Sequence, residues 1–274
     1  MSQVSSAQPA IEPEIVSAIS PEAEYPLPPD VSHLITEDDE PVDNVFSEKQ
    51  QRLLTEPLYS SWPGPGDNRK FLACANVGVF NVARNPAIVP DMLLSLDVEP
   101  HPDIWAKEHR SYLVWEFGKP PDAVVEVVSN KIGNEQTTKK VKYAVMRVGY
   151  YVIYDPELQI SDEVLTIYRL DGLSYRRHDS LQLPELKLGL TLWEGEFEGF
   201  HDTWLRWTDE QGNPILTGKE SAERELAEKE RERAEKEHER AEKERERAEK
   251  ETALQKAEKL AAQLRALGID PDAL

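Results

Sequence analysis

The sequence has little of what marks a secreted, membrane-spanning or nucleotide-hydrolysing protein. One cysteine, Cys74, stands in 274 residues, so no internal disulfide can form. No apolar run is long enough to cross a bilayer, and the N-terminal stretch lacks the basic start and apolar core of a secretory signal. A glycine-rich phosphate loop is also missing. These absences predict a soluble protein in a reducing cytoplasm.

Positive charge and histidine are scarce as well. The 32 Lys and Arg residues face 52 Asp and Glu residues, which gives a formal net charge of -20. Such a balance argues against a protein that binds nucleic acid chiefly through a broad basic surface. It leaves open an enzyme that contacts nucleic acid locally through a metal ion. The six histidines are scattered without metal-ligand spacing, so zinc is not expected.

Composition divides the chain into three regions. Residues 1–42 are rich in Pro, Glu, Asp and Ser and poor in aromatics, which predicts disorder because too little apolar surface is available for burial. Residues 43–217 are long enough for one compact domain. Residues 218–274 consist almost wholly of strong helix formers, with Glu and Lys or Arg three or four positions apart, which predicts one long helix.

The predicted C-terminal helix carries a heptad pattern of alanines. Only one small apolar residue occurs per heptad, so a solvated single helix is as well supported as a coiled coil. Between Leu254 and Leu267 one helix face becomes richer in leucine. We therefore expect any homo-oligomer to form through that end. The repeated alanines are Ala227, Ala234, Ala241 and Ala248.

The central region alternates strand and helix patterns. A first helix is expected in "SEKQQRLLTEP", with Ser47 as its cap. β-branched and aromatic content then predicts strands at 70–82, 90–99, 111–117 and 123–129, and a helix from Asn134 to Arg147. Further strands follow, among them one at 188–200, with hairpin turns at 171–172 and 211–213. This order predicts an α+β fold with an α/β-like core, in which a crossover helix spans a mixed sheet.

An acid stands in the middle of the apolar run "AVVEVVS". If that strand is buried, Glu126 must be paired, protonated or bound to a metal. Asp91 follows Pro90 and opens the strand "MLLSLDV", so the two carboxylates approach each other if the strands are neighbours. Two adjacent carboxylates repel unless a divalent cation neutralises them, and oxygen ligands of this kind suit Mg²⁺, with Mn²⁺ as a substitute. We therefore predict a metal site at Asp91, Glu126 and the backbone carbonyl of Val127.

The helix after this strand offers polar residues on one face. Glu135 and Lys139 are four residues apart, and Tyr143 lies one turn further. A lysine at this place could orient a water molecule or hold a phosphate. Glu135 is equally well explained as an acid at a helix N-terminus. Asp91, taken alone, is as well explained by a structural role at the start of a strand.

Three segments together resemble the Uma family, which is classed with restriction endonucleases and grouped by fold with the PD-(D/E)xK nucleases. They are "VPDMLLSLDVE", "SYLVWEFGKPPDAVVEVVSNKIGNE" and "KVKYAVMRVGYYVIYDP", and the resemblance extends over about residues 45 to 215. It implies a restriction-endonuclease-like fold. The family's first acid falls on Asp91, and its second falls on Glu126, followed by Ser129.

The resemblance also assigns a lysine. The superfamily usually has this lysine two residues after the glutamate, where this chain has Val128. The family pattern instead has a lysine four residues before the helix tyrosine, which is Lys139. The resemblance thus implies a magnesium-dependent DNA endonuclease with Asp91, Glu126 and Lys139 as catalytic residues. Two alternatives stay open: a nuclease acting on RNA or in repair, and a non-catalytic protein that keeps the fold and acts through its C-terminal helix.

Overall fold

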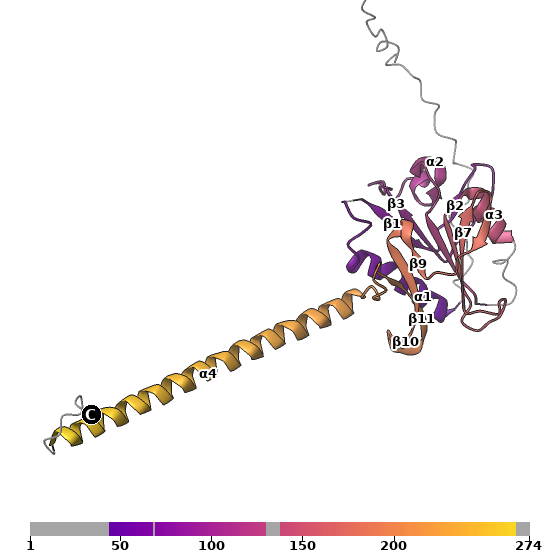
Figure 1. Ribbon diagram of the computed structural model, residues 1–274. Coiled ribbons are helices and arrows are strands. Elements are labelled where there is room, and N and C mark those ends of the chain that lie inside the picture. The colour runs from indigo at the N-terminus through magenta and orange to yellow at the C-terminus, as the bar shows by residue number, and fades with distance from the viewer. Residues whose placement is uncertain (1–43, 68, 130–137, 267–274) are drawn as a thin grey trace, which may run out of the picture.

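The computed structural model describes residues 44–67, 69–129 and 138–266. The predicted disordered segment 1–42 and the helix acid Glu135 lie outside these residues. A compact body of strands and short helices holds most of the described chain, and one long helix projects from it (Figure 1). Among the described residues, no helix combines the length and apolarity that a bilayer span requires.

The first helix, α1 (Val45–Ser60), packs its apolar face on the body. Leu54 and Leu58, four residues apart, are fully buried. The expected cap was wrong: the Asn44 side chain, rather than Ser47, accepts the hydrogen bond at the helix start, from the Ser47 backbone N–H at 2.8 Å. Asn is a favoured N-cap residue because its short side chain reaches the free backbone donors.

The main sheet has six strands in the order β1-β3-β5-β6-β7-β8. Only β5 and β6 run parallel, and the helix α3 (Lys140–Met146) lies in the crossover between them. The other neighbouring pairs are antiparallel, so the predicted mixed sheet with a crossover helix is confirmed. The strands are β1 (Phe71–Ala75), β3 (Met92–Leu96), β5 (Ala123–Val127), β6 (Tyr150–Tyr154), β7 (Leu165–Asp171) and β8 (Ser174–Arg177).

Two smaller sheets complete the body. A parallel pair joins β2 (Val79–Phe80) to β4 (Tyr112–Leu113). Three antiparallel strands, β9 (Gln182–Leu183), β10 (Leu188–Phe197) and β11 (Phe200–Thr208), form the other. In the described parts of the chain, two short 3-10 helices, η1 (Lys107–His109) and η3 (Pro184–Leu186), lie in the connections.

Three expected strands were wrong in extent. The strand at 70–82 divides into β1 and β2 because Asn76 takes a left-handed conformation, with φ 54°. The strand at 111–117 contributes only β4, and its second half is the short helix α2 (Val114–Phe117). The segment 188–200 turns at Glu198 and Gly199, both with positive φ, and so forms the β10–β11 hairpin.

The two expected hairpin turns had different outcomes. Asp171 pairs with Ser174 across β7 and β8, and Gly172 has φ 62°, so the first turn is confirmed. The second, at 211–213, joins no two strands: it returns the chain from β11 to an isolated bridge between Thr208 and Pro214.

Each face of the main sheet has its own apolar core. Side chains alternate along β5, so Val125 and Val127 join the core with α1, β10 and β11, whereas Val124 joins the core with α3. The strand is buried throughout its length. Glu126 is therefore fully buried, on the face that α3 covers.

The last helix, α4 (Gly218–Ala266), is confirmed as one element of 49 residues, about 74 Å long at about 1.5 Å per residue. Thr217 and Glu220 form a capping box, in which each side chain accepts the backbone N–H of the other. Glu220 also pairs with the buried guanidinium of Arg206 at 2.6 Å. Beyond this first turn almost every described residue is exposed, and ion pairs four residues apart, such as Lys229 with Glu225, run along the surface.

Candidate active site

The site begins with two acids on neighbouring strands. Asp91 directly precedes β3, which pairs with β5 so that Met92 lies opposite Val125. Continuing that antiparallel register by one residue brings Asp91 opposite Glu126. Their carboxyl groups interact, since Asp91 is among the groups that raise the pKa of Glu126. The structure thus brings the two predicted metal ligands together.

Asp91 is held by one donor on each oxygen. Its Oδ2 accepts the backbone N–H of Val127 at 2.7 Å, and its Oδ1 accepts Nε2 of Gln51 at 2.9 Å. Burial raises the pKa of Asp91, and the Val127 N–H opposes this rise because it favours the charged carboxylate. Val127 therefore contacts the site through its N–H, and its carbonyl as a metal ligand stays a prediction.

Glu126 has no exposed surface, and each of its oxygens also accepts one hydrogen bond. The Tyr143 hydroxyl donates to Oε1 and the Lys139 ammonium to Oε2, both at 2.7 Å. Burial raises the pKa of Glu126 to about 8, against the opposing effect of Lys139 and with a further rise from Asp91. Without a bound cation, burial therefore favours the protonated form of Glu126.

Three lysines, Lys139, Lys140 and Lys142, lie at the start of helix α3, and one of them contacts Glu126. Lys139 stands at the helix start and its side chain is 28% exposed, so its ammonium connects Glu126 with the surface. Lys140 points elsewhere, with its Nζ 3.4 Å from the ring centre of Tyr168, and Lys142 is exposed. Successive helix residues differ in direction by about 100°, which separates neighbouring lysines in this way.

Two polar residues around the acids, Gln51 and Asn76, were not predicted. Gln51 contacts Asp91 from α1, and Asn76 contacts Gln51 from the end of β1. Gln51 stands three residues before the buried Leu54, so helical periodicity could have placed its amide on the buried face. Tyr143 was expected on the helix, but its hydrogen bond to Glu126 was not. No local pattern marks Asn76.

Other acids near these strands have structural partners. Asp155 is fully buried at the end of β6, but its carboxylate accepts the backbone N–H groups of Gln159, Ile160 and Ser161, so it organises that loop. At the far end of β3, Asp97 forms a bidentate pair with Arg69. These acids are therefore committed to structural roles.

The donor set of Asp91 and Glu126 fits a hard divalent cation. Within the described ranges, no cluster of three or more His, Cys, Asp or Glu side chains could hold a metal. Two carboxylates are nevertheless what Mg²⁺ commonly takes from a protein, because it keeps water molecules and binds phosphate oxygens of the substrate. Glu126 is fully buried and Asp91 partly buried, and a cation would remove the electrostatic cost of ionising them together.

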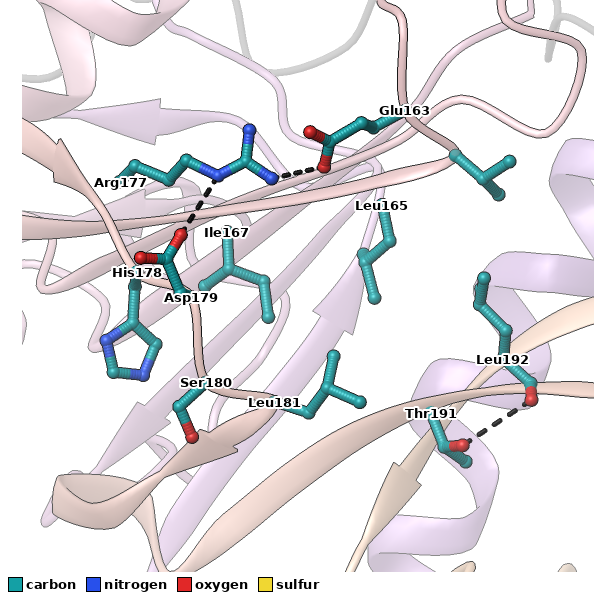
Figure 2. Close-up of a pocket in the computed structure, with 11 residues that line it drawn as sticks. Glu163, Leu165, Ile167, Arg177, His178, Asp179, Ser180, Leu181, Thr191 and Leu192 are labelled. Atoms are coloured by element: carbon teal, nitrogen blue, oxygen red, sulfur yellow. Dashed lines mark hydrogen bonds and ion pairs between the residues drawn. The ribbon is translucent and has the colours of Figure 1, made fainter.

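A groove of about 710 Å³ lies elsewhere, on the sheet face that packs against α1 (Figure 2). Leu165, Ile167 and Leu181 form its apolar wall. On its rim Arg177 pairs with both Glu163 and Asp179, as the dashed lines in Figure 2 show. Arg177 thus serves as the ion-pair partner of both acids on this rim, so the groove offers no counterpart to the Asp91 and Glu126 pair.

Comparison with protein families decides the relationship. The sequence model of the Uma2 family, described as "Putative restriction endonuclease", matches residues 38–197, which is more than half of the chain. The chain belongs to the Uma2 family. No match was found among curated proteins. The Uma2 description points to a nuclease function and hence to a nucleic acid substrate, and the mixed sheet agrees with a restriction-endonuclease-like fold.

The matched Uma2 region contains all three expected catalytic residues, whereas α4 lies outside it. Chemically, the site combines two acids able to bind a cation with an ammonium group that reaches toward solvent. Such a group can offset negative charge on a phosphate.

Proposed function

We propose that this Uma2 protein is a magnesium-dependent endonuclease that hydrolyses DNA phosphodiester bonds, with Asp91, Glu126 and Lys139 as its catalytic residues. The observation that carries the proposal is Glu126, a fully buried acid among valines that contacts both Asp91 and Lys139. A buried acid with a raised pKa, next to a second acid and a partly exposed lysine, is typical of a functional site.

Each protein group has a defined task in this reaction. Asp91, Glu126 and the carbonyl of Val127 would hold Mg²⁺ or, as a substitute, Mn²⁺. Bound there, the cation would polarise the scissile phosphate and lower the pKa of a coordinated water. The Val127 N–H keeps Asp91 oriented, and the Tyr143 hydroxyl fixes Glu126. Lys139 orients the attacking water or offsets the charge that grows on the phosphate oxygens.

Cleavage of supercoiled plasmid DNA tests the proposal. With Mg²⁺ or Mn²⁺ the parent chain should nick or linearise the plasmid, and a chelator should stop the reaction. Lys139→Ala should lower the rate by about 10²-fold or more, as expected for loss of a group that stabilises transition-state charge. Lys140→Ala, on the same helix but directed at Tyr168, is the matched control and should cleave like the parent.

Substrate choice is tested in the same assay. A single-stranded and a duplex RNA of matched length should stay intact while the plasmid is cut. Cleavage of RNA alone would replace DNA by RNA as the substrate. Equal effects of Lys139→Ala and Lys140→Ala, or no cleavage of any substrate in either metal, would instead support the non-catalytic interaction protein.

The surface of α4 supports a second proposal, that the chain forms homo-oligomers through the end of this helix. Leu254 and Leu260 are 62% and 59% exposed in the single chain. Exposed leucines on an otherwise charged helix favour pairing with a second helix, which would cover their apolar surface. The alanine heptads further back bury too little apolar surface to hold such a pair on their own.

A further inference from the structure

The Asp91 carboxylate is attached to a pair of side-chain amides. Nε2 of Gln51 donates to Oδ1 of Asp91 at 2.9 Å and to Oδ1 of Asn76 at 3.2 Å. In return, Nδ2 of Asn76 donates to Oε1 of Gln51 at 2.9 Å. Gln51 is only 4% exposed, so its amide has little access to water. The two amides thus form a closed hydrogen-bonded pair with one remaining donor directed at Asp91.

This pairing decides which end of the Gln51 amide meets the acid. A primary amide has an acceptor oxygen and a donor nitrogen of nearly equal shape, so a rotation of about 180° exchanges them. If Oε1 of Gln51 faced Asp91, two acceptors would stand against each other. Because Asn76 donates to Oε1, the nitrogen is left to face Asp91. Asn76 therefore orients Gln51, and Gln51 in turn holds Asp91.

The backbone places Asn76 for this task. It follows β1 with φ 54°, a left-handed conformation that Asn tolerates better than most residues. Its backbone N–H donates to the carbonyl of Asp91 at 3.2 Å, so Asn76 is tied to the same residue that it serves. With the Val127 N–H on Oδ2, both oxygens of Asp91 are held by uncharged donors.

We propose that Gln51 and Asn76 are positioning residues that fix the Asp91 carboxylate for a divalent cation. The inference rests on the proposed function, because it assigns a role toward the cation of that site. An oxygen that accepts one N–H bond keeps a second lone pair for a metal. A neutral donor fixes the carboxylate without competing for it as a charged group would. Loss of such an outer partner typically lowers metal affinity by about 10- to 100-fold.

The test measures Mn²⁺ binding to the full chain by calorimetry or by electron paramagnetic resonance of the free ion. Gln51→Leu removes the donor to Asp91 and leaves an apolar side chain of similar size. Asn76→Gly removes the orienting amide, and glycine readily adopts the positive φ of this position. Each variant should weaken Mn²⁺ binding by about 10- to 100-fold.

Gln50 provides a matched control on the same helix. It is fully buried, and its amide makes two hydrogen bonds of 2.8 and 2.9 Å to the backbone of Leu205, away from Asp91. Gln50→Leu should lower the melting temperature at least as much as Gln51→Leu, yet bind Mn²⁺ like the parent. A merely structural role for Gln51 would give the two variants the same Mn²⁺ affinity.

Gln51→Leu and Asn76→Gly interrupt the same series of contacts, from Asn76 through Gln51 to Asp91. The double variant Gln51→Leu with Asn76→Gly should therefore bind Mn²⁺ about as weakly as Gln51→Leu alone, since the two effects are coupled. Parent-like Mn²⁺ affinity in both Gln51→Leu and Asn76→Gly would overturn the inference and leave the proposed function standing. Absence of Mn²⁺ binding by the parent chain would overturn both.

Discussion

The two ends of β3 and β5 carry the same kinds of residues in different surroundings. At one end Asp91 and Glu126 meet Lys139, and at the other Asp97 and Asp122 meet Arg69 and Lys119. The second set is partly exposed, and the hydrogen bonds from Arg69 lower the pKa of Asp97. In the first set, burial raises the pKa of both acids. Acids and bases in proximity therefore do not define a site, and the complete burial of Glu126 distinguishes the first end from the second.

The two ends should differ most in their effect on the rate of DNA cleavage. Asp91→Asn should lower the rate of plasmid cleavage by about 10³-fold, because it removes one of two charged cation ligands. Asp97→Asn, at the other end of the same strand, should cleave within about twofold of the parent, since a change at an exposed site usually has a small effect. Gel-based rates under identical metal concentrations check both. Similar losses in the two variants would show that the site has been placed at the wrong end.

The second largest difference between the Asp91–Glu126 end and the Asp97–Asp122 end is expected in how the free energy of unfolding depends on pH. The pKa of Glu126 is about 8 in the folded chain against 4.5 when exposed, so the folded state binds the proton more tightly. Stability contributed by the protonated acid is therefore lost as pH rises from about 4.5 to about 8. Glu126→Gln has no such loss, and without metal it should be more stable than the parent at pH 9 by several kcal/mol.

Urea unfolding in a chelator checks this prediction at pH 5 and at pH 9. At pH 5 the parent and Glu126→Gln should have nearly equal free energies of unfolding, because both carry an uncharged group at this position. Asp122→Asn should not become more stable than the parent at pH 9, since the change removes the ion pair with Lys119. A Glu126→Gln variant that unfolds at every pH would mean a purely structural glutamate.

Cation binding should displace the proton of Glu126. Below pH 8 the metal competes with that proton, so the apparent Mn²⁺ affinity should rise by up to about tenfold per pH unit between pH 6 and 8 and level off above. Calorimetry in buffers of different ionisation enthalpy measures the released protons. A Mn²⁺ affinity that is constant over this range would contradict a protonated Glu126.

The smallest effect is expected from shortening α4. Removing residues 227–274 keeps Glu220, which pairs with the buried Arg206 and caps the helix, so the body should retain its melting temperature. Light scattering should then show a lower oligomeric state, while Mn²⁺ affinity stays unchanged. A full-length chain that is already a monomer would contradict self-association through Leu254 and Leu260.

Several features of the fold followed from local pattern. The length and charge of α4 made it predictable, because helix formers and i,i+4 pairs act within a few residues. The sequence pattern also predicted β3 and β5 as strands. It singled out Glu126 as an unusual acid among valines. The sequence did not predict that the expected strands 70–82 and 111–117 end at Asn76 and at Leu113. Each ends at a change of backbone conformation, and the apolar residues around it have the pattern of a continuous strand.

In the candidate site, too, the sequence identified individual residues, whereas their contacts depended on the tertiary structure. By itself the sequence determined which acids and lysines were available: Glu126 stands out among valines, and the resemblance to the Uma family points to Asp91 and Lys139. Only the tertiary structure decided that Gln51 of α1 meets Asp91, 40 residues away, and that Tyr143 donates to Glu126. Those contacts depend on strand order and on which sheet face each helix covers. Strand order and helix placement depend on how the whole apolar core packs, and no short stretch of sequence contains that information.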